Sequence, residues 1–180
     1  MAIYVALLRG INVGTAKRVA MADLRDLLGA LGYTEVRTLL NSGNAVFAAT
    51  AAAARNAGTR IEQALVKRLG VASRVLVISG AELAEIVAAN PLVEVSDNHS
   101  RLMVAFLLNG ADHARLEPLA RRNWGKERLR LGPRAVYYWC PESLLTSPVA
   151  IAVGKMLGGA MTVRNWNTVL RLHALAEPRA

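Results

Sequence analysis

Cysteine is almost missing from this sequence, which holds only Cys140 among its 180 residues. One thiol cannot form an internal disulfide, and no ligand pattern for zinc surrounds it. No histidine lies near it in the sequence, so we interpret Cys140 as a small buried residue at a strand end rather than a nucleophile. The sequence therefore predicts neither a disulfide scaffold nor a metal site, and no motif in it indicates a cofactor.

Long apolar runs are missing as well. No run reaches the roughly 18 residues that a membrane-spanning helix needs, although 53% of the residues are hydrophobic. The start of the chain, residues 1–9, lacks a basic leader and a small-residue cleavage site, and is typical of a strand rather than a secretion signal. The composition also excludes a disordered chain. We expect a globular cytoplasmic protein that has no membrane association.

Acidic residues are scarce relative to basic ones, 13 against 22, and the formal net charge is +9. Seven basic residues and only two acidic ones lie between residues 115 and 134: Arg115, Arg121, Arg122, Lys126, Arg128, Arg130 and Arg134, with Glu117 and Glu127. A basic segment with Trp124 inside it is typical of a nucleic-acid footprint. The alternative is a solvated helix and hairpin edge that keeps the protein soluble.

The first half of the chain alternates between strand and helix patterns. A continuous apolar run at residues 3–8 is typical of a strand covered on both faces, and Met21, Leu24 and Leu28 recur at helical spacing. The predicted strands are residues 3–8, 35–40, 45–49 and 74–78, with helices that follow residues 20 and 58. Residues 1–79 therefore have the order β-α-β-β-α-β, which is that of the ferredoxin-like split βαβ unit.

Three short patterns predict where helices begin. The segments Thr59 to Glu62 and Ser79 to Glu82 are capping boxes, in which a hydroxyl and a carboxylate satisfy backbone N–H groups. Ser147 before Pro148 is a third helix start, with serine as the N-cap and proline in the first turn. Each pattern fixes one end of a predicted helix.

The second half echoes this order without repeating the sequence. The predicted elements are a strand at residues 102–108, a helix at 112–122, strands at 127–131 and 134–140, and helices from residues 147 and 162. We predict an α+β fold of two ferredoxin-like (split βαβ) units, the second ending in an extra helix, residues 162–176, instead of a fourth strand. Residues 1–95 would form the first unit with its following helix, and residues 96–180 the second unit, packed on the first.

The predicted topology brings two loops together. In a split βαβ sheet the first two strands run in the same direction, so their C-terminal ends share an edge. The loops after these strands carry candidate ligand-binding residues: Arg9, Gly10, Asn12, Gly14 and Lys17 in the first, and Asn41, Ser42, Gly43 and Asn44 in the second. Glycine and asparagine let backbone N–H groups point at a phosphate or carboxylate, with Lys17 and Arg18 behind them. The alternative is that these residues only satisfy tight turns.

Polar residues are also concentrated at the start of the last predicted helix. Thr162 can cap this helix, which would place Arg164 and Asn165 in its first turn, where free N–H groups favour an anion. Four residues are candidates for ligand binding: Arg164, Asn165, Asn167 and Thr168. Trp166 lies on an adjoining, more apolar face, and we interpret it as a core residue.

Four motifs stand out along the chain: YVALLRGINVG at residues 4–14, SGNAVF at 42–47, NP at 90–91 and RNWNTV at 164–169. In this order they resemble the bacterial family known as domain of unknown function 1697, and the similarity runs almost from end to end. The resemblance implies a two-part α+β fold of ferredoxin-like character. It marks residues 9–14, 42–44 and 164–168 as signature positions of the family, and it implies no activity, substrate or cofactor.

The sequence leaves three functions open. The first is a binding module for an anionic ligand, either a nucleic acid or the phosphate of a nucleotide or another phosphorylated small molecule. The second is a structural or interaction protein whose signature residues lock the two halves together. The third is an enzyme on a small anionic substrate, for which the sequence offers no obvious general base. We rank the binding module first, and the sequence predicts neither catalytic residues nor an oligomeric state.

Overall fold

The chain folds into two compact units. A computed structural model describes residues 1–177, apart from the side chains of residues 111 and 112. Unit 1 comprises residues 1–83 and the described residues from 172 onwards, and unit 2 comprises residues 84–171. The boundary lies inside the helix at residues 80–88, whereas the sequence placed it between residues 95 and 96.

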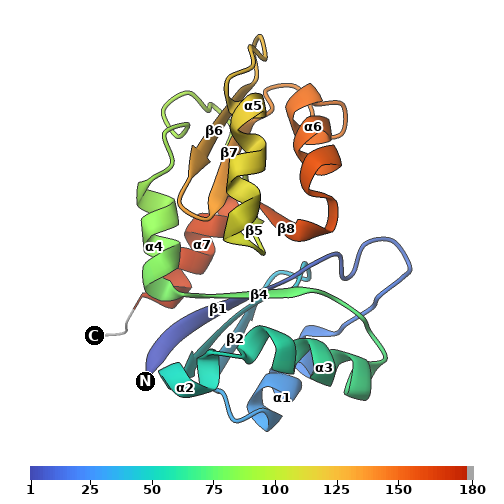
Figure 1. Cartoon of the computed structure of the whole chain (residues 1–180). Coiled ribbons are helices and arrows are strands. Elements are labelled where there is room, and N and C mark those ends of the chain that lie inside the picture. The colour runs from blue at the N-terminus through green and yellow to red at the C-terminus, as the bar shows by residue number, and fades with distance from the viewer. Residues whose placement is uncertain (178–180) are drawn as a thin grey trace. The chain divides into compact units, whose positions relative to one another are not determined.

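Unit 1 is a four-stranded antiparallel sheet with helices between its strands. In chain order its elements are β1 (Ala2–Leu8), α1 (Met21–Ala30), β2 (Thr34–Leu39), β3 (Asn44–Ala49), α2 (Ala51–Ala54), α3 (Ala57–Leu69) and β4 (Val75–Ser79). The strand order is β2-β3-β1-β4, and β3 is antiparallel to both β1 and β2 (Figure 1). The predicted ferredoxin-like order of this half is confirmed.

Helices α1 and α3 lie on the same face of the unit 1 sheet (Figure 1). Apolar side chains from the sheet and both helices form one core, which includes Leu8 of β1, Leu24 of α1 and Ile61 of α3. Tyr33 and Phe47 pack against each other in this core, with ring centroids 4.4 Å apart. Because successive strand residues point to opposite faces, this core fixes which β1 side chains meet the helices.

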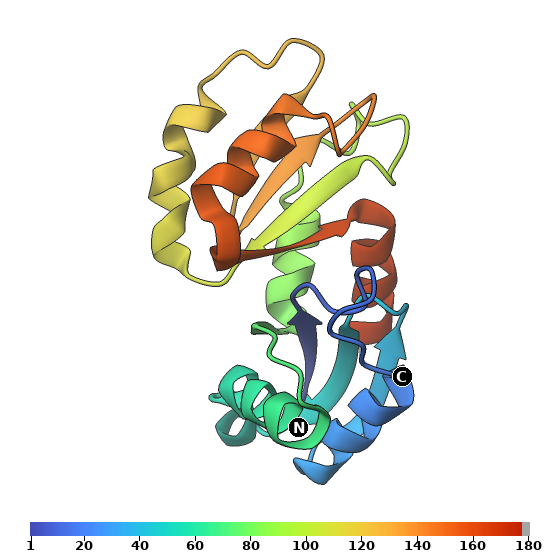
Figure 2. The same ribbon diagram turned by 90° about the vertical axis from the view of Figure 1, so that its right-hand side faces the viewer.

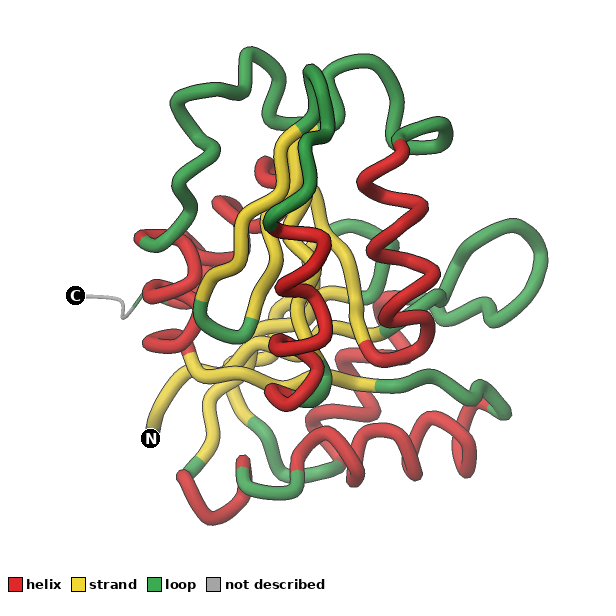
Figure 3. Tube along the Cα trace, turned by 45° about the horizontal axis from the view of Figure 1, so that its top comes forward, coloured by secondary structure: helices red, strands yellow, loops and turns green. Residues whose placement is uncertain are grey.

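Unit 2 has the same plan. From the boundary helix onwards the elements are α4 (Gly80–Ala88), β5 (Leu102–Leu107), the 3-10 helix η1 (Gly110–Leu116), α5 (Glu117–Ala120), β6 (Arg128–Gly132), β7 (Ala135–Trp139), α6 (Pro148–Leu157), the 3-10 helix η2 (Gly158–Ala160), β8 (Met161–Asn165) and α7 (Trp166–Ala176). The antiparallel sheet has the order β6-β7-β5-β8 (Figure 2). Figure 3 shows these strands in yellow and the helices in red. No helix of the described residues is long and apolar enough to span a bilayer.

The prediction that the second unit ends in a helix instead of a fourth strand is wrong. Residues 161–165 form β8, which pairs antiparallel with β5, and α7 begins only at Trp166. Thr162 and Arg164 are buried, whereas Met161, Val163 and Asn165 are half-buried, which is the two-residue period of a strand. The β-branched Thr162 and Val163 favour this extended conformation. The fold class of two ferredoxin-like units is confirmed, with α7 as an additional C-terminal helix.

Two of the three predicted helix starts are confirmed. The backbone N–H of Ser79 donates to Oε2 of Glu82 at 2.8 Å, and the N–H of Glu82 donates to Oγ of Ser79 at 3.1 Å. Ser147 Oγ accepts from the N–H of Ala150 at 3.0 Å and so caps α6. In both cases the side chain satisfies an N–H group that has no partner within the helix.

The third predicted start, the capping box from Thr59 to Glu62, is wrong. Helix α3 begins earlier, at Ala57. Glu62 instead accepts from the backbone N–H of Val75 at 2.8 Å and pairs with Arg74 at 3.2 Å. A strand that is distant in sequence therefore uses the carboxylate that the local pattern assigned to the helix end.

Candidate functional site

The loops after β1 and β2 meet at one edge of unit 1, as the topology predicts. The backbone N–H of Leu8 donates to the carbonyl of Gly43 at 2.8 Å. The Asn12 side chain donates from Nδ2 to the carbonyl of Asn41 at 2.7 Å. These bonds join segments about thirty residues apart in the sequence, and the juxtaposition follows from β3 lying between β1 and β2.

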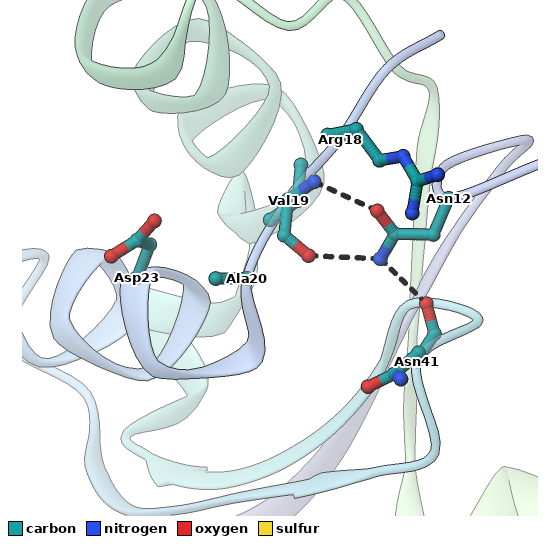
Figure 4. Close-up of a pocket in the computed structure, with 6 residues that line it drawn as sticks. All are labelled: Asn12, Arg18, Val19, Ala20, Asp23 and Asn41. Carbon is teal, nitrogen blue, oxygen red and sulfur yellow. Dashed lines mark hydrogen bonds between the residues drawn. The ribbon is translucent and has the colours of Figure 1, made fainter. Parts of the chain in front are cut away.

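Asn12 holds the first loop in place. Its Nδ2 also donates to the carbonyl of Val19 at 2.8 Å, and its Oδ1 accepts from the N–H of Val19 at 2.8 Å (Figure 4). Its backbone adopts a φ of 55°, a left-handed conformation that asparagine tolerates better than most residues. Both N–H bonds of the amide are therefore used within the protein, so Asn12 positions the loop and has no donor left for a ligand.

The glycines of the two loops have different roles. Gly10 and Gly14 have φ values of 65° and 62°, and no described atom would come within 4 Å of a side-chain carbon added there, apart from their own chain neighbours. Gly43 has a φ of 82°, and an added Cβ would lie 2.8 Å from Cβ of Leu8. The first two allow the backbone to turn, whereas Gly43 allows the turn to pack against β1.

Asn44 and Ser42 stabilise the β2–β3 turn from inside. The Asn44 side chain is buried, and its Nδ2 donates to the carbonyl of Leu39 at 2.8 Å and to Oγ of Ser42 at 2.9 Å. The carbonyl of Arg9 accepts from Oγ of Ser73 at 2.9 Å. Lys17 is exposed and has a φ of 51°, and its backbone carbonyl accepts from the N–H of Asn12 at 3.1 Å. These candidates mainly shape the loops.

A pocket of about 550 Å³ opens between these loops and the start of α1. Its lining residues are Asn12, Arg18, Val19, Ala20, Asp23 and Asn41 (Figure 4). Only Asn12 and Asn41 belong to the candidates named from the sequence. Arg18 was expected behind the glycines of the first loop, whereas Asp23 was missed because the pocket depends on how the loop folds back at Val19, although an acid in the first turn of a helix is a visible signal.

The two charged residues of this pocket are unpaired. Arg18 and Asp23 are exposed, and neither side chain has a hydrogen bond or ion pair with another described residue. Helix α1 begins beside them, and its N-cap, Ala20, has no polar side chain to satisfy the first N–H groups. The pocket therefore offers the guanidinium of Arg18 before the helix, and the free backbone donors and the carboxylate of Asp23 in the first turn of α1.

Arg164 lies on β8 of unit 2, so its predicted place in the first turn of a helix is wrong. Its side chain is only 8% exposed, and its Nη1 donates to Oγ1 of Thr162 at 3.0 Å and to the carbonyl of Val163 at 2.8 Å. Burial lowers the pKa of the guanidinium to about 10, because a charged group loses solvation there. Both hydrogen bonds are made to residues of β8, so they hold the Arg164 side chain against its own strand.

Asn165, and not Thr162, caps α7. Its Oδ1 accepts from the backbone N–H of Thr168 at 3.0 Å and from Oγ1 of Thr168 at 2.9 Å. Asn167 is exposed, and its Nδ2 donates to Oγ of Ser100 at 3.2 Å. The cap moves three residues along because β8 occupies the positions assigned to the helix. All of these bonds lie within unit 2.

The thiol of Cys140 is placed as the sequence predicts, directly after β7 and fully buried. The pKa of the Cys140 thiol is raised to about 11, mainly by burial. The charge of Glu127 also raises this pKa, and the hydrogen bond with Ser147 partly offsets the rise. A thiolate is therefore disfavoured, and the nucleophile alternative has no support. Among the described residues, no group of three or more His, Cys, Asp or Glu side chains could hold a metal ion.

Two ferredoxin-like units in one α+β chain define the structural class of this protein. Its residues 1–137 match the family described as "Protein of unknown function (DUF1697)", and the chain belongs to this family. The resemblance read from the four motifs is thereby confirmed. The fold is similar to the structure of the conserved bacterial protein SP0830 from Streptococcus pneumoniae, at 24% identity and a TM-score of 0.77, over 98% of this chain and 99% of that chain. No curated protein matches the chain.

Proposed function

We propose that this protein is a binding module for an anionic ligand, and that the pocket at the start of α1 takes the phosphate of a nucleotide. The observation that carries the proposal is the unpaired guanidinium of Arg18 in a pocket of about 550 Å³. Pockets for small ligands have volumes of about 300–1,000 Å³, so a nucleotide is a suitable size.

The start of α1 supplies the donors that a phosphate needs. The first N–H groups of a helix have no partner within it, and the helix dipole makes this end positive. Arg18 adds a planar fork of donors that can bind two phosphate oxygens at once. In Figure 4 the guanidinium of Arg18 lies near the amide of Asn12, on the pocket side of the loop.

Asp23 favours a nucleotide over a bare inorganic anion. Its carboxylate would repel a free phosphate ion, but it can accept hydrogen bonds from a ribose hydroxyl or a base amino group. The exposed Asn41 side chain offers one acceptor and two donors on the opposite side of the pocket. In this proposal Gly10, Gly14 and Lys17 shape the loop.

The other candidate residues in the loops after β1 and β2 support the proposed pocket by fixing the shape of these loops. Asn12 keeps the loop closed, and Ser42, Gly43 and Asn44 keep the β2–β3 turn in the conformation that aims Asn41 at the pocket. The alternative, a purely structural role of the signature residues, is favoured by one observation: the amides of Asn12 and Asn44 both donate to backbone carbonyls. That observation explains these two residues and leaves Arg18 unexplained.

The test is a thermal-shift and calorimetry series with inorganic phosphate, AMP, ADP and ATP. A nucleotide at one hundred times its dissociation constant should add about 2.7 kcal/mol of stability and raise the melting temperature by about 5–10 °C. Arg18→Gln should abolish the shift, and Arg171→Gln, which changes an exposed arginine on α7, should keep it.

Asp23→Asn separates a nucleotide from a bare anion. This change should weaken nucleotide binding and leave phosphate binding equal or stronger, because it removes a negative charge and an acceptor together. The proposal fails if no nucleotide shifts the melting temperature, or if Arg18→Gln binds as tightly as the parent protein.

A further inference from the structure

Unit 2 has a concentration of basic and aromatic side chains along the outer edge of its sheet, separate from the pocket of unit 1. A hollow of about 220 Å³ lies at the loop that joins α5 to β6 and at the start of β6. Its lining residues are Arg122, Asn123, Trp124, Gly125, Glu127, Arg128, Leu129 and Arg130. We name this surface the β6 edge, because β6 is an edge strand of its sheet.

An arginine stacks on the tryptophan of the β6 edge. The guanidinium carbon of Arg122 lies over the Trp124 ring, 4.5 Å from its centroid. The ring is held in turn by its Nε1, which donates to the carbonyl of Leu119 at 2.9 Å, and by packing against the core of unit 2. One face of the guanidinium therefore rests on a fixed ring, and the exposed side chain leaves the other face open to solvent.

Three arginines of the β6 edge are not neutralised by a carboxylate. Arg128 and Arg130 are exposed and flank the buried Leu129, so they point to the same face of β6. Neither they nor Arg122 form an ion pair with another described residue. Nη1 of Arg128 donates to the carbonyls of Gly125 and Glu127, and Nη1 of Arg130 donates to the carbonyl of Leu129, so both side chains use one nitrogen within the protein and keep their charge.

The acidic residues nearby are already engaged elsewhere. Glu127 accepts from the N–H of Val149 at 2.9 Å, at the start of α6. Glu117 pairs with Arg121 at 3.4 Å, and Glu142 pairs with Lys126 at 3.7 Å. Glu117 and Glu142 therefore balance Arg121 and Lys126, and the hollow itself is lined by three arginines and the carboxylate of Glu127, so positive charge is in excess there.

We propose that the β6 edge binds single-stranded nucleic acid, with phosphates at Arg128 and Arg130 and one base stacked on the guanidinium of Arg122. Unpaired bases stack on aromatic rings and on arginine planes, whereas bases inside a duplex are not open to such contact. Charged side chains on an edge strand also prevent association between sheets, but that role needs no stacked tryptophan beneath an arginine. The inference stands independently of the nucleotide pocket.

The first test measures how salt changes the affinity for a labelled oligonucleotide of about 16 nucleotides, followed by fluorescence anisotropy. Exchanging Arg122, Arg128 and Arg130 together for glutamine should reduce the slope of log affinity against log salt by about 1.4, because each of the two phosphate contacts, at Arg128 and Arg130, contributes about 0.7 on a single strand. The matched control exchanges Arg55, Lys67 and Arg68 of unit 1 for glutamine, which removes the same charge from another exposed surface.

An unchanged slope in the triple variant would overturn the proposal. So would an equal loss in the control, because net charge alone would then explain the binding. A duplex of the same length should bind at least about tenfold more weakly than the single strand, given the loss of base stacking. Equal binding of the duplex, or of polyglutamate, would show a general polyanion surface and refute the assignment.

The second test isolates the stack. Arg122→Lys keeps the charge and removes the planar group, so the affinity should fall about fivefold to tenfold with an unchanged salt slope. Arg121→Lys is the control, because Arg121 is the neighbouring arginine that pairs with Glu117. Equal affinities of the two variants would show that Arg122 acts only as a charge and would refute the stacking geometry.

Discussion

Removing the Asn12 amide should release the loop after β1 and destabilise unit 1. The amide makes three hydrogen bonds, at 2.8, 2.7 and 2.8 Å, of which the one to Asn41 is solvent-exposed. Each bond to Val19 contributes about 1 kcal/mol, and the exposed one less. Alanine at a φ of 55° adds about 1 kcal/mol of backbone strain. We expect Asn12→Ala to lower the free energy of unfolding by about 3 kcal/mol.

Two further variants separate the contributions. Asn12→Gly removes the hydrogen bonds without the backbone strain, so it should lower the free energy of unfolding by about 2 kcal/mol. Asn12→Asp keeps the acceptor for Val19 but turns an oxygen toward two carbonyls, and it should destabilise at least as much as glycine. Asn41→Ala is the control, since only the backbone carbonyl of Asn41 takes part, and it should stay within about 0.5 kcal/mol of the parent.

The assay is urea denaturation combined with hydrogen exchange at the backbone amide of Val19. All three tryptophans, Trp124, Trp139 and Trp166, belong to unit 2, so their fluorescence would not report on this loop. Circular dichroism should follow the global transition, and the Val19 amide should lose its protection in each Asn12 variant. Asn12→Ala with parent stability and a protected Val19 amide would refute the reasoning.

Three other outcomes follow from the same structure. Gly43→Ala should lower the free energy of unfolding by about 2–4 kcal/mol in urea, because its Cβ would lie 2.8 Å from that of Leu8, whereas Gly10→Ala should lose only about 1 kcal/mol. Asn165→Ala should lose about 1 kcal/mol through the missing cap of α7, measured in the same way. Burial raises the pKa of Cys140 from 9.0 to about 11, so the folded state keeps the proton longer and stability should fall as pH rises between these values; Cys140→Ser should reduce this fall.

The topology of unit 1 could be predicted because its local signals agree with its tertiary structure. Apolar periodicity gave the strands, and the order β-α-β-β-α-β has one common arrangement in space. That arrangement placed the loops of Asn12 and Asn41 side by side, and the bond between them at 2.7 Å confirms it. No feature of the sequence, however, indicated that the Asn12 amide would form two hydrogen bonds with the backbone of Val19, since this depends on where the loop folds back.

The fourth strand of unit 2 was missed because its polar side chains are buried. Pattern rules place arginine and threonine on the outside, so Thr162 was interpreted as the cap of a helix and Arg164 as a residue of its first turn. In the structure they bond to each other and to the backbone of the same strand, which permits their burial. The sequence does contain a signal for the cap at Asn165, because asparagine is a favoured N-cap residue and Thr168 follows three residues later.

The polar residues of this protein divide according to whether their hydrogen bonds are completed within the chain. Asn12, Asn44 and Asn165 bond to backbone groups, so replacing them removes stability whether or not a ligand is present. Arg18 and Arg122 make no ion pair with a described residue, so replacing Arg18 should leave the unliganded fold within about 0.5 kcal/mol of the parent, and replacing Arg122, which stacks on Trp124, within about 1 kcal/mol. Loss of stability without ligand and loss of binding should therefore fall on different residues. Measuring both the free energy of unfolding without ligand and the ligand affinity for one set of variants distinguishes the binding role from the structural one.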